Sequence, residues 1–156
     1  MKTQNLFKYT IAALLIFGLA CSKNDDDNGP QVTLSEKLIG TWKPIEMGTI
    51  CASGGMDIES LTTCEQSGRL TFNANGSWSE TYFYEYMPGT CEDDGISSGT
   101  WKIVDGKLFV TEETFGENEI TFFEVDITTL KVGQYDNEIC GDDNMSSYYY
   151  FKYQKI

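Results

Sequence analysis

Short segments in which apolar and polar residues alternate recur from about residue 38 onward, and turn residues separate them. Such alternation is typical of β-strands that bury one side. Asn75-Gly76 and Asp105-Gly106 are strong hairpin signals. A short helix is expected over Leu34–Ile39, capped by Thr33 or Ser35, and residues 55–63 have room for another helical turn. The pattern predicts eight strands, over 40–47, 69–73, 78–86, 100–104, 107–111, 120–127, 130–132 and 147–153.

The connections between these segments alternate between long and short. In a meander, alternate connections lie at opposite ends of the sheet, so every long connection falls at one end. This arrangement favours an all-β, eight-stranded antiparallel up-and-down barrel over residues 34–156, with one tight end and one loop-rich mouth. An open sandwich is the alternative, because the doublet Phe122-Phe123 and the run 148–151 break the alternation. The long connections are expected at 51–67, 87–98, 112–118 and 136–146.

Five cysteines, Cys21, Cys51, Cys64, Cys91 and Cys140, occur in the chain. The last four fall in or beside long connections, hence at one end of the barrel. Two of them flank the hairpin that turns at Asn75-Gly76, and the other two end the first strand and precede the last, which are neighbours in a closed barrel. We therefore predict the disulfides Cys64–Cys91 and Cys51–Cys140.

The composition excludes several function classes. The chain has no histidine, which removes Ser-His-Asp and Cys-His catalysis and most zinc enzymes. Its 24 Asp and Glu residues outnumber 11 Lys and Arg residues, for a net charge of −13. Because nucleic-acid binding needs a basic surface, no nucleic-acid partner is expected. We predict a protein that is not an enzyme, needs no cofactor or metal, and is a monomer.

Residues 1–20 have the pattern of a secretory signal. Lys2 and Lys8 give a positive start, and an apolar run over 11–20 follows that is too short to span a bilayer. The run ends at Ala20, directly before Cys21. Leu19-Ala20-Cys21 resembles the lipobox of bacterial lipoproteins, although Gly18 stands where that motif usually has leucine. The resemblance implies that Cys21 is lipidated and becomes the mature N-terminus.

Residues 21–33 form the next predicted segment, a lipidated N-terminus and flexible tether. The stretch 22–30 is rich in Asp and Asn and too polar to pack. Cys21 and the acidic residues after it resemble the export signal of Bacteroidota-type surface lipoproteins. This resemblance implies a lipid anchor in the outer membrane, palmitate among the acyl groups, and a protein that faces outward from the cell; a periplasm-facing protein on a spacer is the alternative.

Two Gly-Thr-Trp triplets and the segments around them resemble the lipocalin-like domains of small lipoproteins. Gly40-Thr41-Trp42 opens the series, and Gly99-Thr100-Trp101 repeats it after a Leu-Thr-Phe segment, an Asn-Gly turn and a cysteine. The resemblance covers about residues 34–156 and implies a lipocalin-like barrel of the calycin type. It gives Gly40, Trp42, Gly99 and Trp101 structural roles, with Trp42 as a core plug at the tight end.

An eight-stranded barrel either fills with side chains or holds one small ligand. Aromatic residues on the predicted strands are candidates to line an apolar cavity, with core packing as the alternative. We therefore predict that the protein binds a small, partly apolar ligand at the barrel mouth. The alternative is a surface interaction module, or an inhibitor or accessory protein, whose disulfide-held loops contact a protein or glycan. The candidate ligand-binding residues are Trp78, Tyr82, Tyr84, Tyr86, Phe122 and Tyr150.

Acidic residues gather beside the cysteines of two long connections. Glu92-Asp93-Asp94 follows Cys91, and 136–143 holds four more acids around Cys140. Carboxylates are calcium ligands, but the spacing of an EF-hand is missing, so a solvated acidic rim is the simpler interpretation.

Overall fold

The computed structural model describes residues 32–141 and 146–156. These residues form one compact unit, Val32–Ile156, with its own hydrophobic core and two disulfides within it. The signal peptide, the tether and Cys21 lie outside the described residues. Among the described residues, none of the helices has the length and hydropathy of a membrane span.

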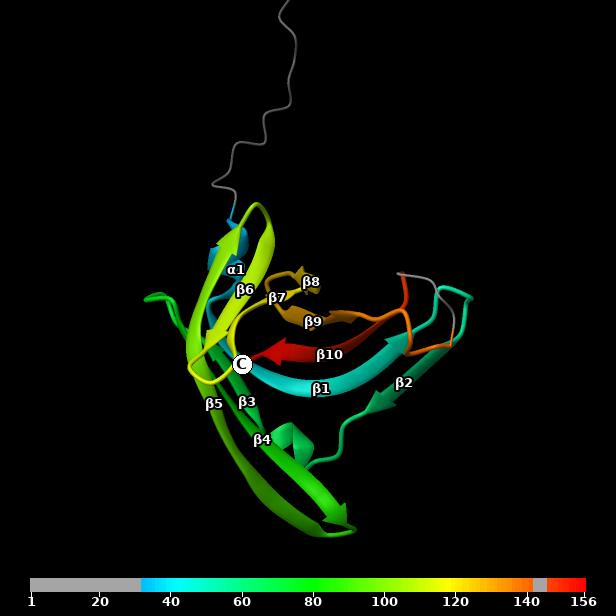
Figure 1. Ribbon diagram of the computed structural model, residues 1–156. Coiled ribbons are helices and arrows are strands. Elements are labelled where there is room, and N and C mark those ends of the chain that lie inside the picture. Colours follow the sequence, from blue (N-terminus) through cyan, green and yellow to red (C-terminus); the bar gives the residue numbers. More distant parts are fainter. Residues whose placement is uncertain (1–31, 142–145) are drawn as a thin grey trace, which may run out of the picture. The chain divides into compact units, whose positions relative to one another are not determined.

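The unit is built mainly from β-strands, as predicted (Figure 1). A short helix α1 (Leu34–Leu38) precedes the strands, and a 3-10 helix η1 (Glu65–Ser67) lies between β2 and β3. The strands are β1 (Gly40–Ile50), β2 (Met56–Ser60), β3 (Arg69–Phe72), β4 (Ser77–Met87), β5 (Thr90–Val104), β6 (Lys107–Glu112), β7 (Gly116–Ile120), β8 (Phe122–Val125), β9 (Thr129–Tyr135) and β10 (Tyr148–Lys155).

All pairings are antiparallel, in the order β7-β6-β5-β4-β3-β1-β10-β9-β8, and β2 adds to β1. The two ends of this path, β7 and β8, are separated by Thr121 alone. The Gln134 side chain on β9 bridges the seam: its Nε2 donates to the Glu119 carbonyl oxygen at 3.2 Å, and its Oε1 accepts from the Thr121 hydroxyl at 2.7 Å. The sheet is therefore a nearly closed barrel, as predicted.

The described residues form ten strands, two more than the eight predicted. Residues 56–60 pair with β1 as a strand, where a helical turn was expected, and η1 follows them. The expected connection 112–118 contains β7, and the expected strand 120–127 is interrupted at Thr121, which uses its side chain at the barrel seam. The wall nevertheless follows the predicted meander, because β7 and β8 occupy the place of one strand.

The expected long connection 87–98 is also wrong. Residues 90–98 belong to β5, which pairs with β4 almost to the tip, so the loop shrinks to Pro88-Gly89. The resulting hairpin reaches well past the other strands (green, Figure 1). Register shifts after Tyr82 and Tyr84 accommodate the polar residues 92–95, whose strand propensity is low. Long and short connections therefore do not segregate as cleanly as predicted.

Local sequence explains several of the observed elements. Helix α1 begins at a capping box in which the Thr33 Oγ1 accepts from the Glu36 N–H and the Thr33 N–H donates to the Glu36 carboxylate. Asp105 and Gly106 both have positive φ, at 51° and 78°, as the tight hairpin between β5 and β6 requires. Pro44 lies beside a bulge in β1, one of the places that a strand allows proline.

The core fills the end of the barrel that α1 covers. Trp42 is fully buried there, as predicted, and its Nε1 donates to the Leu38 carbonyl oxygen at 2.8 Å. The Lys155 Nζ lies 4.9 Å from the Trp42 ring and donates to the Lys37 carbonyl oxygen at the helix end. Gly40 makes room for Lys155 and has a φ of 139°. The core consists of Leu38, Trp42, Leu70, Phe72, Trp78, Leu108, Leu130 and Tyr153.

The second Gly-Thr-Trp motif is also structural. Trp101 packs edge-on against Phe72, with ring centroids 5.6 Å apart, and donates to the Asn73 carbonyl oxygen at 3.1 Å. Gly99 lies against the Thr111 carbonyl and the Trp78 ring; a Cβ at this position would collide with the carbonyl and crowd the ring. These contacts fasten the β3–β4 turn to β5.

Candidate ligand-binding cavity

A cavity of about 430 Å³ lies in the barrel beyond the core. Its lining comes from β1, β4, β7, β9 and β10, and from Leu61 and Glu65 before and at the start of η1, so it requires the closed wall. Tyr153 belongs both to the core and to the cavity lining, and therefore forms part of the cavity floor. The lining residues are Pro44, Met47, Leu61, Glu65, Glu80, Thr81, Tyr82, Phe83, Tyr84, Ile120, Val132, Gly133, Gln134, Tyr149, Phe151 and Tyr153.

Several apolar side chains in the cavity wall are exposed to solvent. Met47, Tyr84 and Phe151 are each about 40% exposed although they line a concave surface. Tyr149 on β10 adds a further half-open aromatic ring. Exposed apolar groups that converge in a hollow are typical of a ligand site, because a ligand that covers them removes this area from water.

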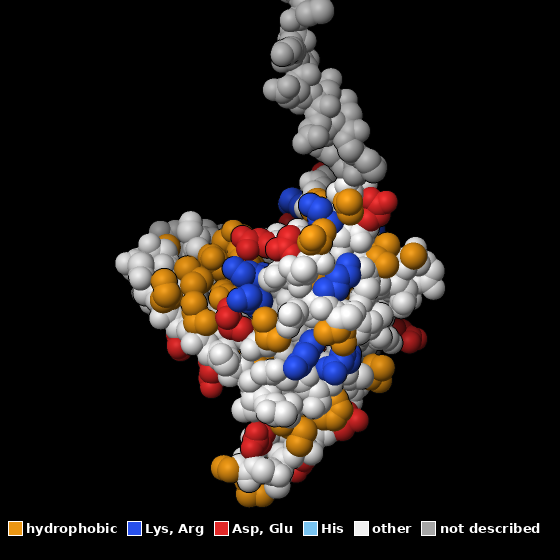
Figure 2. Space-filling view, turned by 180° about the vertical axis from the view of Figure 1, so that it is seen from behind, with side chains coloured by type: hydrophobic (Ala, Val, Ile, Leu, Met, Phe, Trp, Pro, Cys, Tyr) orange, Lys and Arg blue, Asp and Glu red, His pale blue; other side chains and the backbone are white. Residues whose placement is uncertain are grey.

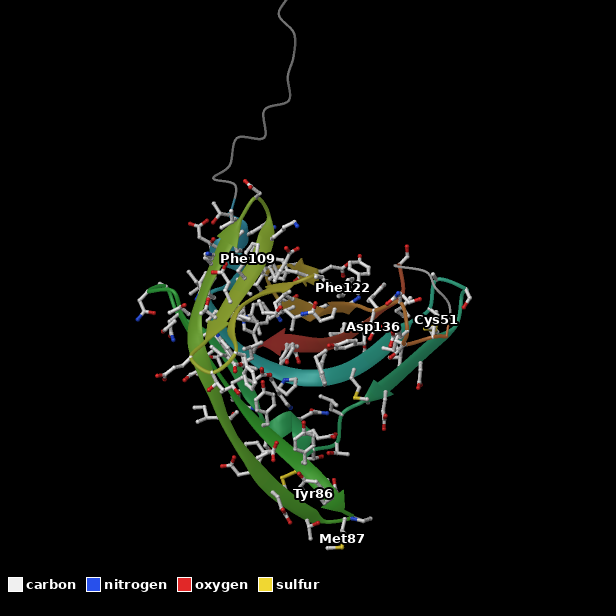
Figure 3. All side chains as sticks on the ribbon, viewed as in Figure 1. Cys51, Tyr86, Met87, Phe109, Phe122 and Asp136 are labelled. Carbon is white, nitrogen blue, oxygen red and sulfur yellow. A yellow bond between two sulfur atoms is a disulfide. The ribbon has the colours of Figure 1, made fainter. Side chains whose placement is uncertain are left out.

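Two of the six candidate residues lie where the cavity prediction requires them. Tyr82 and Tyr84 line the cavity from β4. Trp78, four residues before Tyr82 on the same strand, is buried in the core. Tyr86, two residues after Tyr84, lies near the tip of the hairpin and is 64% exposed; its ring contacts that of Tyr84, with centroids 5.9 Å apart, but does not line the cavity (Figure 3). The long strand therefore runs from the core, past the cavity, into solvent, and only its middle serves the site.

The prediction that Phe122 and Tyr150 line the cavity is wrong, because both side chains lie on the outer side of the barrel wall. On β10, Tyr153 reaches the core and lines the cavity together with Tyr149 and Phe151, so the odd-numbered residues from 149 to 153 face inward. Tyr149, Phe151 and Tyr153 therefore take the positions predicted for Tyr150. Phe122 likewise faces outward, and its neighbour Phe123 packs against the core.

Outside the wall, Phe122, Tyr135, Tyr148 and Tyr150 form a second aromatic cluster, the outer aromatic cluster. Phe122 and Tyr148 stack with ring centroids 4.1 Å apart. Tyr150 covers Gly48, where a Cβ would collide with its ring, as aromatic side chains commonly cover a strand glycine. Its hydroxyl donates to Glu46 at 3.0 Å, and burial, followed by this contact, raises the pKa of Tyr150 to about 12. This cluster holds the β1–β10–β9–β8 wall together.

Glu80 is the functional candidate that the prediction missed. It lies on β4 between Trp78 and Tyr82, where it interrupts an otherwise aromatic side of the strand. Its Oε2 accepts from the Tyr82 hydroxyl at 2.6 Å, and its Oε1 accepts from the Tyr153 hydroxyl at 2.8 Å. An acid in the middle of an apolar strand side is the sequence signal that identifies it.

Burial is the main cause of the pKa shifts of Glu80, Tyr82 and Tyr153. Loss of hydration raises the pKa of the Glu80 carboxyl, the two tyrosine hydroxyls oppose that rise, and the charge of Glu112 adds to it. The pKa values of Tyr82 and Tyr153 are raised by burial first and by the Glu80 charge second. Both hydroxyls therefore stay protonated and keep donating to Glu80.

The two disulfides join the pairs that the sequence predicts. Cys51–Cys140 connects the end of β1 to the segment before β10, and Cys64–Cys91 fastens the segment before η1 to β5. The Cys51 end of β1 and Asp136 lie on the same side of the barrel, away from the β4–β5 tip (Figure 3). Cys91 lies within β5 rather than in a loop.

The expected acidic rim is partly described. Glu92, Asp93 and Asp94 are exposed on β5, whereas Asp142 and Asp143 lie outside the described residues. Over residues 32–141 and 146–156, groups of three or more potential metal-ligating side chains do not occur. Figure 2 shows the Lys and Arg side chains of one face in small groups, with acidic side chains beside some of them.

Comparison with known proteins agrees with this architecture. Curated proteins give no match to the chain. The family model of the lipocalin-like domain matches residues 38–132, which run from the buried Trp42 region through β9 to the cavity residue Val132. The chain therefore belongs to the lipocalin-like domain family.

Proposed function

We propose that this protein binds a small, partly apolar ligand in the cavity at the barrel mouth and is not an enzyme. The observation that carries the proposal is the open cavity of about 430 Å³, whose aromatic and aliphatic walls remain exposed. A cavity of this size falls within the range of small-molecule sites. The tyrosine hydroxyls and Glu80 supply the few polar groups that orient a ligand in such sites.

A neutral fluorescent probe tests this proposal. N-phenyl-1-naphthylamine, an apolar molecule that brightens when it leaves water, is titrated into purified oxidised residues 22–156. We expect saturable binding of one probe per chain. Val132→Trp places a large ring in the cavity and is expected to weaken binding at least tenfold. Glu124→Trp, on the exposed outer side of β8, is the control and should bind like the wild type. Folded protein that leaves the probe dark would refute the proposal, as would unchanged binding by Val132→Trp.

We also propose that Cys21 carries a lipid that anchors the protein in the outer membrane, with the barrel on the cell surface. The four cysteines of the barrel pair with one another, so the two disulfides do not require Cys21, which supports a separate role for it. Metabolic labelling with an alkyne analogue of palmitate should mark the wild type and not Cys21→Ala. Protease added to intact cells is expected to digest the barrel, because the barrel faces outward. A barrel that is digested only after the cells are broken would lie on the periplasmic face.

A surface interaction module is the second candidate function. The β4–β5 hairpin exposes Tyr86, Met87 and Ile96, each more than 60% exposed. A photo-crosslinking residue at position 86 should then capture a partner on intact cells. The same residue at Ile127, equally exposed on another turn, is the control. Equal capture at both positions, or none, would count against this second function.

A further inference from the structure

We propose that the cavity selects ligands that carry a positively charged amine, which pairs with Glu80, and rejects apolar ligands that carry a carboxylate. This inference rests on the proposed ligand-binding function and names the ligand class. The observation behind it is the balance of charge in the cavity. Two acids, Glu65 and Glu80, line it, and the described lining residues include neither Lys nor Arg.

Four basic residues of the surrounding strands make their contacts elsewhere. Lys152 contacts Glu46, and Lys131 contacts Glu124, both on the outer side of the wall. The Arg69 guanidinium donates to the carbonyl oxygens of residues 66–68. Lys155 donates to the Lys37 carbonyl oxygen at the opposite, closed end. A fatty acid in the cavity would therefore place its carboxylate beside Glu80 without a cation to compensate, which is unfavourable in a poorly hydrated site.

Glu80 is oriented to receive a cation. Each of its oxygens accepts one tyrosine hydroxyl, and a carboxylate oxygen has room for a second donor. The two tyrosines hold the carboxylate in a fixed position at the cavity, so little side-chain entropy is lost when a ligand binds. Because burial disfavours the Glu80 charge in the empty cavity, an ammonium group supplies the positive partner that the carboxylate lacks.

The walls favour the same ligand class. Six aromatic residues, Tyr82, Phe83, Tyr84, Tyr149, Phe151 and Tyr153, line the cavity. Aromatic faces attract organic cations through their quadrupole, most strongly where water is excluded. The aliphatic part of the ligand is accommodated by Met47, Leu61 and Val132. Apolar contacts thus hold the body of the ligand, while Glu80 and the aromatic rings favour a ligand with a positive charge.

Displacement of bound N-phenyl-1-naphthylamine by octylamine, octanol and octanoate tests the inference. The three competitors have the same chain length and differ in charge; the amine, like a lysine side chain with a pKa of about 10.4, is charged at pH 7. We expect octylamine to compete at least tenfold more strongly than octanoate, with octanol between them. Glu80→Gln should abolish the preference for the amine and keep octanol binding. Glu124→Gln, which removes a charge from the outer wall, should retain the preference.

The outcomes separate this inference from the function on which it rests. If the probe binds and the three competitors displace it equally, or if octanoate is preferred, the amine assignment is overturned and the binding function stands. A preference for octylamine that survives Glu80→Gln overturns the role of Glu80. If the probe fails to bind the folded wild type, the proposed function fails, and the amine assignment fails with it.

Discussion

Removing the Cys51–Cys140 disulfide is expected to destabilise the protein more than removing Cys64–Cys91. The two bonds join residues 89 and 27 positions apart. In the chain-entropy model, a cross-link stabilises the fold by restricting the unfolded chain, and the effect grows with the logarithm of the loop length. The model gives about 4.6 kcal/mol for the longer loop and about 3.6 kcal/mol for the shorter one. The Cys51→Ser/Cys140→Ser variant should therefore lose about 1 kcal/mol more than Cys64→Ser/Cys91→Ser.

Urea unfolding of residues 22–156, followed by tryptophan fluorescence, measures both losses under one set of conditions. The dependence of the unfolding free energy on urea concentration should also steepen when the longer cross-link is removed, because the released chain exposes more surface. An equal or greater loss in Cys64→Ser/Cys91→Ser would refute the reasoning. The folded-state contacts of η1 with β1 and β4 would then outweigh the entropy of the unfolded chain.

Three further predictions concern the core, the wall and the cavity. Trp42→Phe leaves the buried Leu38 carbonyl without its donor and should lower the unfolding free energy by about 2–3 kcal/mol in urea titrations; an unchanged midpoint would contradict the role of that hydrogen bond. Gly133→Ala places a Cβ against the Tyr149 carbonyl and should cost about 1–3 kcal/mol, seen as a lower melting temperature; Gly55→Ala, whose Cβ would lie at an ordinary contact distance of 3.5 Å from the Cys51 Sγ, is the control for packing. The raised pKa of Glu80 means that the fold favours its protonated form, so its contribution to stability is present below pH 4.5 and is lost as pH rises through the native pKa. As the pH rises from 4, the unfolding free energy of the wild type should therefore fall relative to that of Glu80→Gln. Parallel pH profiles of the two proteins would contradict the raised pKa of Glu80.

Local signals made much of the fold predictable. The turns at Asn75-Gly76 and Asp105-Gly106, the cap of α1 and the buried Trp42 each follow from residues within a few positions of one another. The disulfide pairs were predictable as well, because the order of the strands alone determines which cysteines are neighbours.

Side-chain direction was harder to predict. The sequence leaves the strand sides of Phe122 and Tyr150 open, because the doublet Phe122-Phe123 and the run 148–151 place aromatic residues on both sides of their strands. In the structure, Phe123, Tyr149 and Phe151 take the inward positions, and Phe122 and Tyr150 lie outside. The outer extension of β5 was missed because residues 92–95 have low strand propensity and form a strand only through pairing with β4.

Glu80 illustrates the limit of single-position reasoning. Charged residues on strands usually face solvent, so the sequence alone suggests that Glu80 merely interrupts the aromatic side of β4. Its meaning depends on Tyr153, which lies 73 positions away in the sequence and meets Glu80 only in the closed barrel.

Native mass spectrometry of oxidised residues 22–156, incubated with a lipid and metabolite extract, tests the central claim most directly. We predict one retained small-molecule adduct per chain with both disulfides intact, and loss of that adduct in Val132→Trp. A wild-type chain that stays bare while both disulfides are formed would contradict the claim that the cavity is a ligand site.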